Sequence, residues 1–145
     1  LQVHPEEFCR DVGDALYDET SLIEVEKKNN SPSHDILGQI VCKEWGLNRD
    51  VESVIRWHHV YDLEERDSVS DVEINNLIDV VIVGNWLSHT MKFGFSGHRS
   101  GKSLPIEVLE RLSLEEDQLD FFKEETRESF KDFKNFLKLV ERSVI

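Results

Sequence analysis

Three histidines and an aspartate lie close together in the stretch SHDILGQIVCKEWGLNRDVESVIRWHHV, which covers residues 33–60. His34 is followed directly by Asp35, and His58 and His59 form a pair near the end of the stretch. Imidazole nitrogens suit Zn²⁺, Fe and Mn²⁺, and a carboxylate is expected to complete such a set of ligands. These residues therefore predict either a divalent metal site or the degenerate remnant of one.

Two short helices must position these side chains. Ser33 is a suitable N-cap for the first helix, and Asn48 is a suitable N-cap for the second. Their inward faces carry apolar residues, namely Leu37, Val41 and Trp45 in the first and Val51, Val54 and Ile55 in the second. His34 continues the first face, and His58 continues the second, with His59 at its edge. The pattern predicts a helical hairpin with its histidines turned inward.

The histidine pair imposes a geometric condition. Because His58 and His59 are consecutive, their side chains diverge by about 100° on a helix. Both can serve one centre only if the centre lies between the two directions, or if there are two metals. A histidine on an apolar face can also be a core residue that is hydrogen-bonded to a backbone carbonyl, and this alternative stays open.

A longer helix brings two more polar residues inward. Residues 72–93 are mostly apolar, and the spacing of the apolar residues favours a helix over a buried strand. Asn85 and His89 share the inward stripe of this helix with Val81 and Ile82. We therefore expect three helices to point polar side chains towards a common interior.

The rest of the chain also has helical patterns, which predicts an all-α fold of about seven helices in an irregular bundle. Further helices are expected over residues 5–17, 21–28, 105–112 and from 113 onward. The first has an apolar face made of Phe8, Val12 and Leu16. Residues 62–71 have the composition of an exposed linker. We expect residues 1–145 to form a single helical domain.

The final helix carries an apolar stripe over most of its length. The stripe consists of Leu119, Phe122, Phe130, Phe133, Leu137 and Val140, and Phe121 and Phe136 lie off its main line. So wide an apolar arc either packs into the domain or covers a partner. We expect it to pack against the helix over residues 72–93.

Composition narrows the class of protein. The chain has 145 residues, of which 39% are hydrophobic and 32% charged, as is typical of a globular domain. It has 30 acidic and 17 basic residues and a net charge of −13, which argues against nucleic-acid binding because contacts to phosphate need clustered basic residues. Neither a membrane span nor a signal peptide is indicated, so we expect a cytoplasmic location and no membrane partner. Cys9 and Cys42 lie in apolar helical patterns and are expected to be buried, reduced thiols.

The stretch that carries the histidines resembles the second half of an HDOD domain, a divergent relative of the HD and HD-GYP metal-dependent phosphohydrolases. The matching features, in order and spacing, are His34, Gly38, Trp45-Gly46-Leu47 and His58-His59. The family also has an acidic position before the His34 helix, where this chain offers Glu24 or Glu26. The resemblance covers about residues 5–95, and the C-terminal helices at about 105–145 lie outside it.

Two departures bear on activity. The family's upstream His-Asp pair, in a Leu-Leu-His-Asp-Ile-Gly context, is not present in this chain, so we expect the chain to be a piece of a longer protein. Asn85 occupies the position that the resemblance assigns to an aspartate ligand, and an amide supplies no anionic ligand. The resemblance therefore implies a regulatory module of bacterial signal transduction, without catalysis, that works through protein partners and can form homo-oligomers. His34, His58 and His59 would then be a vestigial metal set, with no metal firmly implied.

The alternative is an active HD-type phosphohydrolase acting on a nucleotide or a cyclic dinucleotide. In that case His34 and Asp35 would be the metal-binding His-Asp pair, with His4 upstream and Asp79 downstream. A bound metal would activate water and polarise a phosphoryl oxygen.

Overall fold

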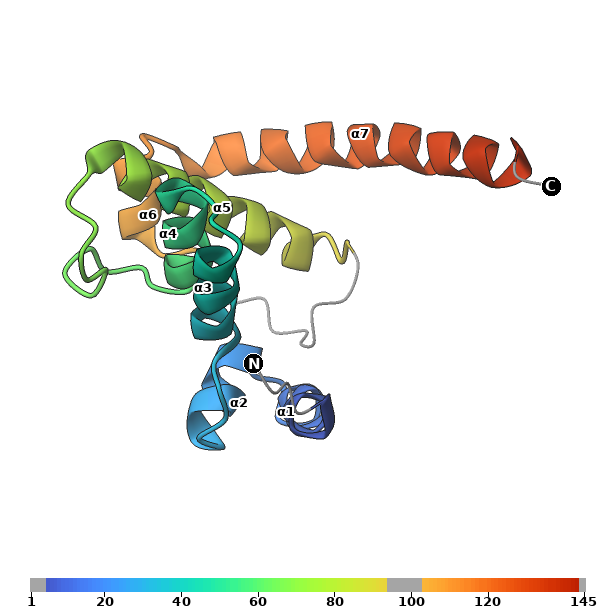
Figure 1. Cartoon of the computed structure of the whole chain (residues 1–145). Coiled ribbons are helices and arrows are strands. Elements are labelled where there is room, and N and C mark those ends of the chain that lie inside the picture. The colour runs from blue at the N-terminus through green and yellow to red at the C-terminus, as the bar shows by residue number, and fades with distance from the viewer. Residues whose placement is uncertain (1–4, 94–102, 144–145) are drawn as a thin grey trace. The chain divides into compact units, whose positions relative to one another are not determined.

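The structure is a computed structural model that describes residues 5–93 and 103–143. These residues form seven α-helices and no strand, which confirms the predicted all-α fold (Figure 1). The helices are α1 (Pro5–Tyr17), α2 (Leu22–Lys28), α3 (His34–Glu44), α4 (Arg49–Trp57), α5 (Val72–Thr90), α6 (Ile106–Arg111) and α7 (Glu116–Ser143). None of the described helices combines the length and apolarity that crossing a bilayer requires.

The chain divides into two compact units, Leu1–Leu112 and Ser113–Ile145. The first contains α1 to α6, and the second consists of α7 and the residues next to it. The single domain expected from the sequence, and the docking of α7 on α5, stay predictions. His4, which belongs to the alternative ligand set, lies outside the described residues.

Helices α3 and α4 form the hairpin that carries the histidines, and α4 also packs on α5. The close approach of α3 to α4 depends on Gly38. A Cβ atom at Gly38 would lie 2.5 Å from Cγ2 of Ile55, closer than two such atoms can approach. The absent side chain therefore lets α3 lie close against α4, with the start of α3 beside the end of α4.

Helices α1 and α2 pack around Ala15, Leu22 and Val25. The apolar face predicted for α1 is only partly correct, because Phe8 and Leu16 are both exposed. Asp11 is buried instead, and its carboxylate accepts hydrogen bonds from the side chains of Asn29, at 2.8 Å, and Arg10, at 3.1 Å. These donors make the burial of a charged group tolerable. Cys9 is also exposed, so the expectation that it is buried was wrong, whereas Cys42 of α3 is buried as expected.

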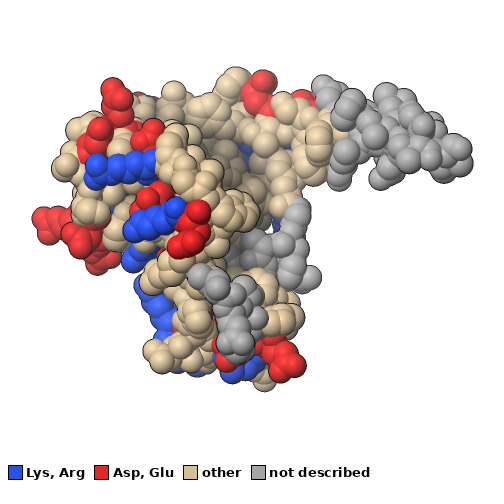
Figure 2. All heavy atoms as spheres, viewed as in Figure 1, with Lys and Arg blue, Asp and Glu red and all other residues tan. Residues whose placement is uncertain are grey.

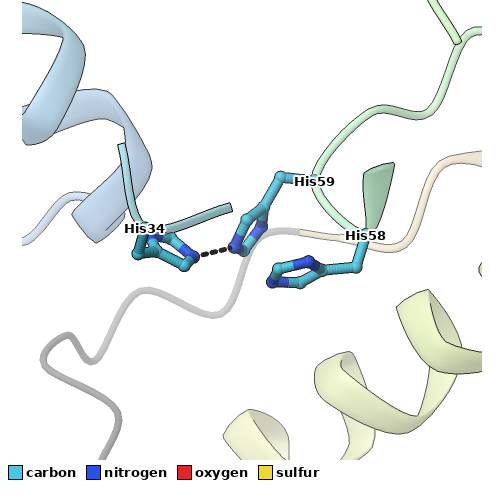
Figure 3. A group of neighbouring side chains, drawn as sticks. All are labelled: His34, His58 and His59. Carbon is cyan, nitrogen blue, oxygen red and sulfur yellow. Dashed lines mark hydrogen bonds between the residues drawn. The ribbon is translucent and has the colours of Figure 1, made fainter. Parts of the chain in front are cut away.

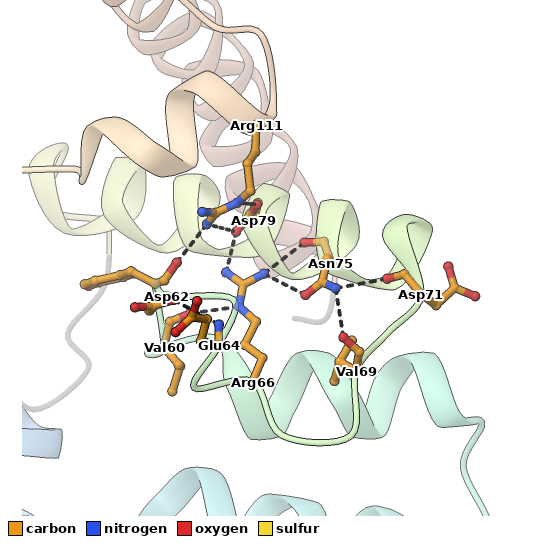
Figure 4. Close-up of polar contacts among 10 residues, drawn as sticks. Val60, Asp62, Glu64, Arg66, Val69, Asp71, Asn75, Asp79 and Arg111 are labelled. Atoms are coloured by element: carbon orange, nitrogen blue, oxygen red, sulfur yellow. Dashed lines mark hydrogen bonds and ion pairs between the residues drawn. The ribbon is translucent and has the colours of Figure 1, made fainter.

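The connection between α4 and α5 is more than an exposed linker. Most of residues 62–71 are exposed as predicted, but Arg66 is fully buried and forms an ion pair with Asp79 of α5. The Arg66 guanidinium also donates to the backbone oxygen of Val60, at 3.0 Å, and to the side-chain oxygen of Asn75, at 3.1 Å (Figure 4). Arg66 thus holds the connecting segment against α5.

Charges of both signs are interspersed on the surface. Figure 2 shows acidic side chains beside basic ones on the face that it draws. Exposed ion pairs in the first unit include Lys28 with Asp18, at 2.9 Å, and Lys43 with Glu52, at 3.2 Å. Each of these lysines is therefore partly neutralised by a neighbouring carboxylate.

Candidate metal centre

Three imidazole rings converge at the open end of the α3–α4 hairpin (Figure 3). One ligand nitrogen from each of His34, His58 and His59 lies within 4.8 Å of the other two. The Nε2 atoms of His34 and His59 are 2.9 Å apart. Among the described residues, these three histidines form the group whose geometry could hold a metal ion.

The ends of the two helices explain the convergence. His34 is the first residue of α3, and His58 is the C-cap residue of α4. His59 follows α4, so the divergence of about 100° expected for two consecutive helical residues does not apply. The rings of His58 and His59 lie 4.0 Å apart, centre to centre, and at 4.9 Å the ring of His59 is also close to that of His34. One centre between the three rings is therefore possible without a second metal.

Glu26 fixes the orientation of His34. The carboxylate of Glu26 is buried and lies 2.8 and 3.0 Å from Nδ1 of His34, and it also accepts from the backbone N–H of His34 at 3.3 Å. Since an ionised carboxylate only accepts hydrogen bonds, Nδ1 carries the proton and donates. In the neutral ring, Nε2 of His34 then holds a lone pair directed at the cluster. A carboxylate behind a histidine in this way is common at metal sites.

The structure distinguishes the two acidic residues that the resemblance suggested. Glu26 lies under His34, whereas Glu24 belongs to a capping box at the start of α2 and accepts from the hydroxyl of Ser21 at 2.8 Å. The Ser-x-x-Glu spacing of Ser21 and Glu24 is the sequence signature of a capping box, and this signal could have separated Glu24 from Glu26.

His58 is fixed in the same way by a backbone group. Its Nδ1 lies 2.8 Å from the carbonyl oxygen of Ile55, which can only accept, so Nδ1 donates and Nε2 holds the lone pair. Burial lowers the pKa of His58 below its ordinary value, which favours the neutral ring that a metal requires. The sequence left open whether such a histidine bonds a carbonyl or binds a metal. The geometry of His58 is compatible with both, through different nitrogens.

The site fits a metal once the rings shift, because its ligand nitrogens lie up to 4.8 Å apart and the most distant ones must approach by more than about 1 Å. Without a metal, the facing Nε2 atoms of His34 and His59 need a proton between them, because two lone pairs at 2.9 Å repel each other. In a tetrahedral zinc site with bonds of about 2.0–2.1 Å, the ligand nitrogens lie about 3.3–3.4 Å apart. For this pair, an outward shift of a few tenths of an ångström would therefore replace the shared proton by a cation. Three imidazoles would leave a fourth position open.

Asp35 takes part in a different interaction. Its carboxylate accepts from the hydroxyl of Ser33 and pairs with the guanidinium of Arg56. Burial raises the pKa of Asp35, but the hydrogen bond from Ser33 and the charge of Arg56 outweigh this and hold the pKa below its ordinary value. Asp79 is buried between Arg66 and Arg111 (Figure 4). The structure thus does not place either carboxylate of the alternative ligand set in the histidine group.

Asn85 and His89 lie in the wall of a cavity next to the histidines. The cavity has a volume of about 200 Å³, and His58 and His59 contribute to the same wall. Burial lowers the pKa of His89 below its ordinary value. The lining also includes Lys27 and Trp86, which the sequence did not single out: a lysine on a short polar helix usually faces solvent, and a tryptophan on an apolar helix usually belongs to the core.

Comparison of the chain with protein-family models, with curated proteins and with solved structures finds no match in any of the three. The resemblance to HDOD domains therefore stays a prediction from the sequence.

Proposed function

We propose that this chain is a regulatory module of a bacterial signal-transduction protein, similar to HDOD domains, that binds one divalent metal and does not turn over a substrate. The observation that carries the metal site is the convergence of His34, His58 and His59 with the Nδ1 atoms of two of them already engaged. The regulatory role follows from the resemblance.

The proposed ligands are Nε2 of His34, Nε2 of His58 and a ring nitrogen of His59, with Glu26 orienting His34. Neutral nitrogen ligands suit Zn²⁺ and also accept Fe or Mn²⁺. When bound, the metal would supply a Lewis acid with an open coordination position. In a regulatory module, its role is to hold the start of α3 against the end of α4.

The charges around the site favour binding over catalysis. Asp35 is held by Arg56, and Asp79 is held by Arg66 and Arg111, so neither is free to act as a ligand or a base. Because these carboxylates are paired elsewhere, the proposed centre has nitrogen ligands only. General-base catalysis would need another group near the open position.

A second candidate function is a metal-dependent phosphohydrolase. It is favoured by the cavity beside His58 and His59, whose wall includes Lys27. A metal in this wall could polarise a phosphoryl oxygen, and a lysine could bind the negative charge.

One set of assays separates the two functions. Purified protein and the variants His34→Ala and His89→Ala are analysed for bound metal by mass spectrometry. They are then assayed with nucleotides, a cyclic dinucleotide and a chromogenic phosphodiester in the presence of added Mn²⁺. We expect one metal per chain in the wild type and in His89→Ala, little in His34→Ala, and no turnover by any of them. Turnover that disappears in His34→Ala would establish the phosphohydrolase, and wild-type protein that never holds a metal would refute both candidates.

A further inference from the structure

Helix α7 has an apolar stripe that is long for a single helix. At a rise of about 1.5 Å per residue, its 28 residues span about 42 Å. Apolar residues recur along one side at spacings of three and four, from Leu119 through Phe130 and Phe133 to Val140. A stripe of this kind stabilises a helix only when another surface covers it.

Part of the stripe carries an exposed aromatic side chain. Leu119 near the start of α7 is buried, but Phe133 further along the same stripe is 51% exposed. The rings of Phe130 and Phe133 lie 6.3 Å apart, centre to centre, so they form one continuous aromatic surface. Exposed aromatic surface of this kind marks an interaction site when it belongs to a continuous apolar stripe.

The charges of α7 and of Glu115, the residue before it, differ between the first part of the helix and the rest. Residues 115–125 contain six acidic residues and one basic residue, a net charge of −5. Residues 126–143 contain five basic and three acidic residues, a net charge of +2. Ion pairs within the helix, such as Lys123 with Asp120, do not remove this difference.

We propose that two copies of the chain associate through their α7 helices in an antiparallel arrangement. An antiparallel pair places the acidic part of each helix beside the basic part of the other, whereas a parallel pair would place two parts of charge −5 together. Antiparallel helix dipoles also attract. The partner's stripe would cover Phe133, and the twofold symmetry would close the assembly at two copies. This association does not depend on the metal centre.

Two exposed phenylalanines supply a matched test of the association. Phe133 lies on the stripe, whereas Phe121, which is 61% exposed, lies on another side of α7. The molar mass of the full chain is measured by light scattering and analytical ultracentrifugation, with circular dichroism to verify folding. We expect a dimer for the wild type and Phe121→Glu, and a dissociation constant raised at least about tenfold in Phe133→Glu. A monomeric wild type, or equal weakening by both substitutions, would overturn the proposal.

Spin labels test the direction of the helices. One nitroxide is attached at Asp117→Cys, or as a control at Glu128→Cys, in a chain that carries Cys9→Ser and Cys42→Ala. In an antiparallel dimer the two labels at position 117, near one end of α7, lie more than about 35 Å apart. The two labels at position 128, near the middle of the helix, lie less than about 25 Å apart. Short distances at both positions would mean a parallel dimer and would refute the antiparallel arrangement.

Discussion

Two polar clusters in the first unit differ in how their groups are paired. Around Asp79, the carboxylate is shared by Arg66 and Arg111, which donates from Nε at 2.6 Å. Around His34, the carboxylate of Glu26 lies behind the ring, and the nitrogen on the other side faces a nitrogen of His59. The first cluster pairs its buried carboxylate with two guanidinium groups, and the second directs ring nitrogens at a common point.

This difference separates a structural cluster from a binding site. A buried carboxylate between two guanidinium groups needs nothing more, and it joins α5 to α6 and to the connection before α5. A cluster of facing imidazoles is stable only with a proton or a cation between the rings. Loss of Asp79 should therefore affect folding, whereas loss of one histidine should affect metal binding.

The largest effect is expected for Asp79→Ala. It leaves the buried guanidinium of Arg66 without its countercharge, which should lower the free energy of unfolding by about 3–5 kcal/mol, measured by urea denaturation. Arg111→Ala keeps the pair of Arg66 with Asp79 and should cost less. Asp120→Ala, which removes an exposed pair with Lys123, should cost less than about 1 kcal/mol. Equal losses for Asp79→Ala and Asp120→Ala would show that the Asp79 cluster contributes no more than a surface pair.

Substitution of Gly38 tests the support beneath the histidines. Gly38→Ala forces a methyl group against Ile55 and should destabilise the first unit by about 1–3 kcal/mol. Gly84→Ala is the matched control, because no atom lies within 4 Å of a Cβ atom at that position of α5. Removal of a helical glycine there should stabilise the protein by about 0.5–1 kcal/mol. The same sign of change for both variants, measured by thermal unfolding, would contradict the close contact of α3 with α4.

Glu26→Gln tests the group behind His34. The amide keeps the size of the side chain but removes the charge that makes the imidazole a stronger ligand, so metal affinity should fall by about 10–100-fold. Glu52→Gln is the control, because Glu52 pairs with Lys43 and is not part of the histidine cluster. Competition with a chromogenic chelator gives both affinities. An unchanged affinity in Glu26→Gln would mean that the carboxylate does not act through His34.

The smallest effect concerns Asp11, a satisfied carboxylate outside both clusters. Burial raises the pKa of Asp11, but hydrogen bonds from Ser31, Asn29 and Arg10 outweigh it, so the pKa lies below the ordinary 3.8. Between the two pKa values the unfolded chain binds more protons than the folded one, so stability falls as the pH drops below about 4. Asp11→Asn should flatten this part of the stability–pH curve, measured by urea denaturation between about pH 3 and 5. A curve of unchanged slope would assign the acid sensitivity to other carboxylates.

Local sequence predicted the helices and the direction of the histidines. Apolar spacing defined the helices, and polar residues such as Asn48, whose side chain accepts from the backbone N–H of Val51 at 2.9 Å, marked where they begin. The sequence could predict that the histidines lie close together, because both helices of the hairpin are short and a tight turn joins them. These features depend on neighbours in the sequence.

Partners distant in the sequence could not be predicted in this way. Arg66 lies in a polar segment, and nothing near it indicates that Asp79 would draw it into the interior. Trp45 was expected on the inward face of α3, but it follows the last helical residue and is 76% exposed. Helical periodicity predicts the direction of a side chain only within the helix, and Trp45 lies just beyond its last residue.

A cobalt titration tests the metal centre most directly. Co²⁺ is added to metal-free wild-type protein and to the variants His34→Ala, His58→Ala, His59→Ala and His89→Ala, and the visible absorption of the ion is recorded. We predict one Co²⁺ per chain, with the bands of a four-coordinate nitrogen site in the wild type and His89→Ala, and loss of these bands in each of the other three variants. Bands that persist without His34, His58 or His59, or a wild type that binds no Co²⁺, would contradict a metal centre built from these three histidines.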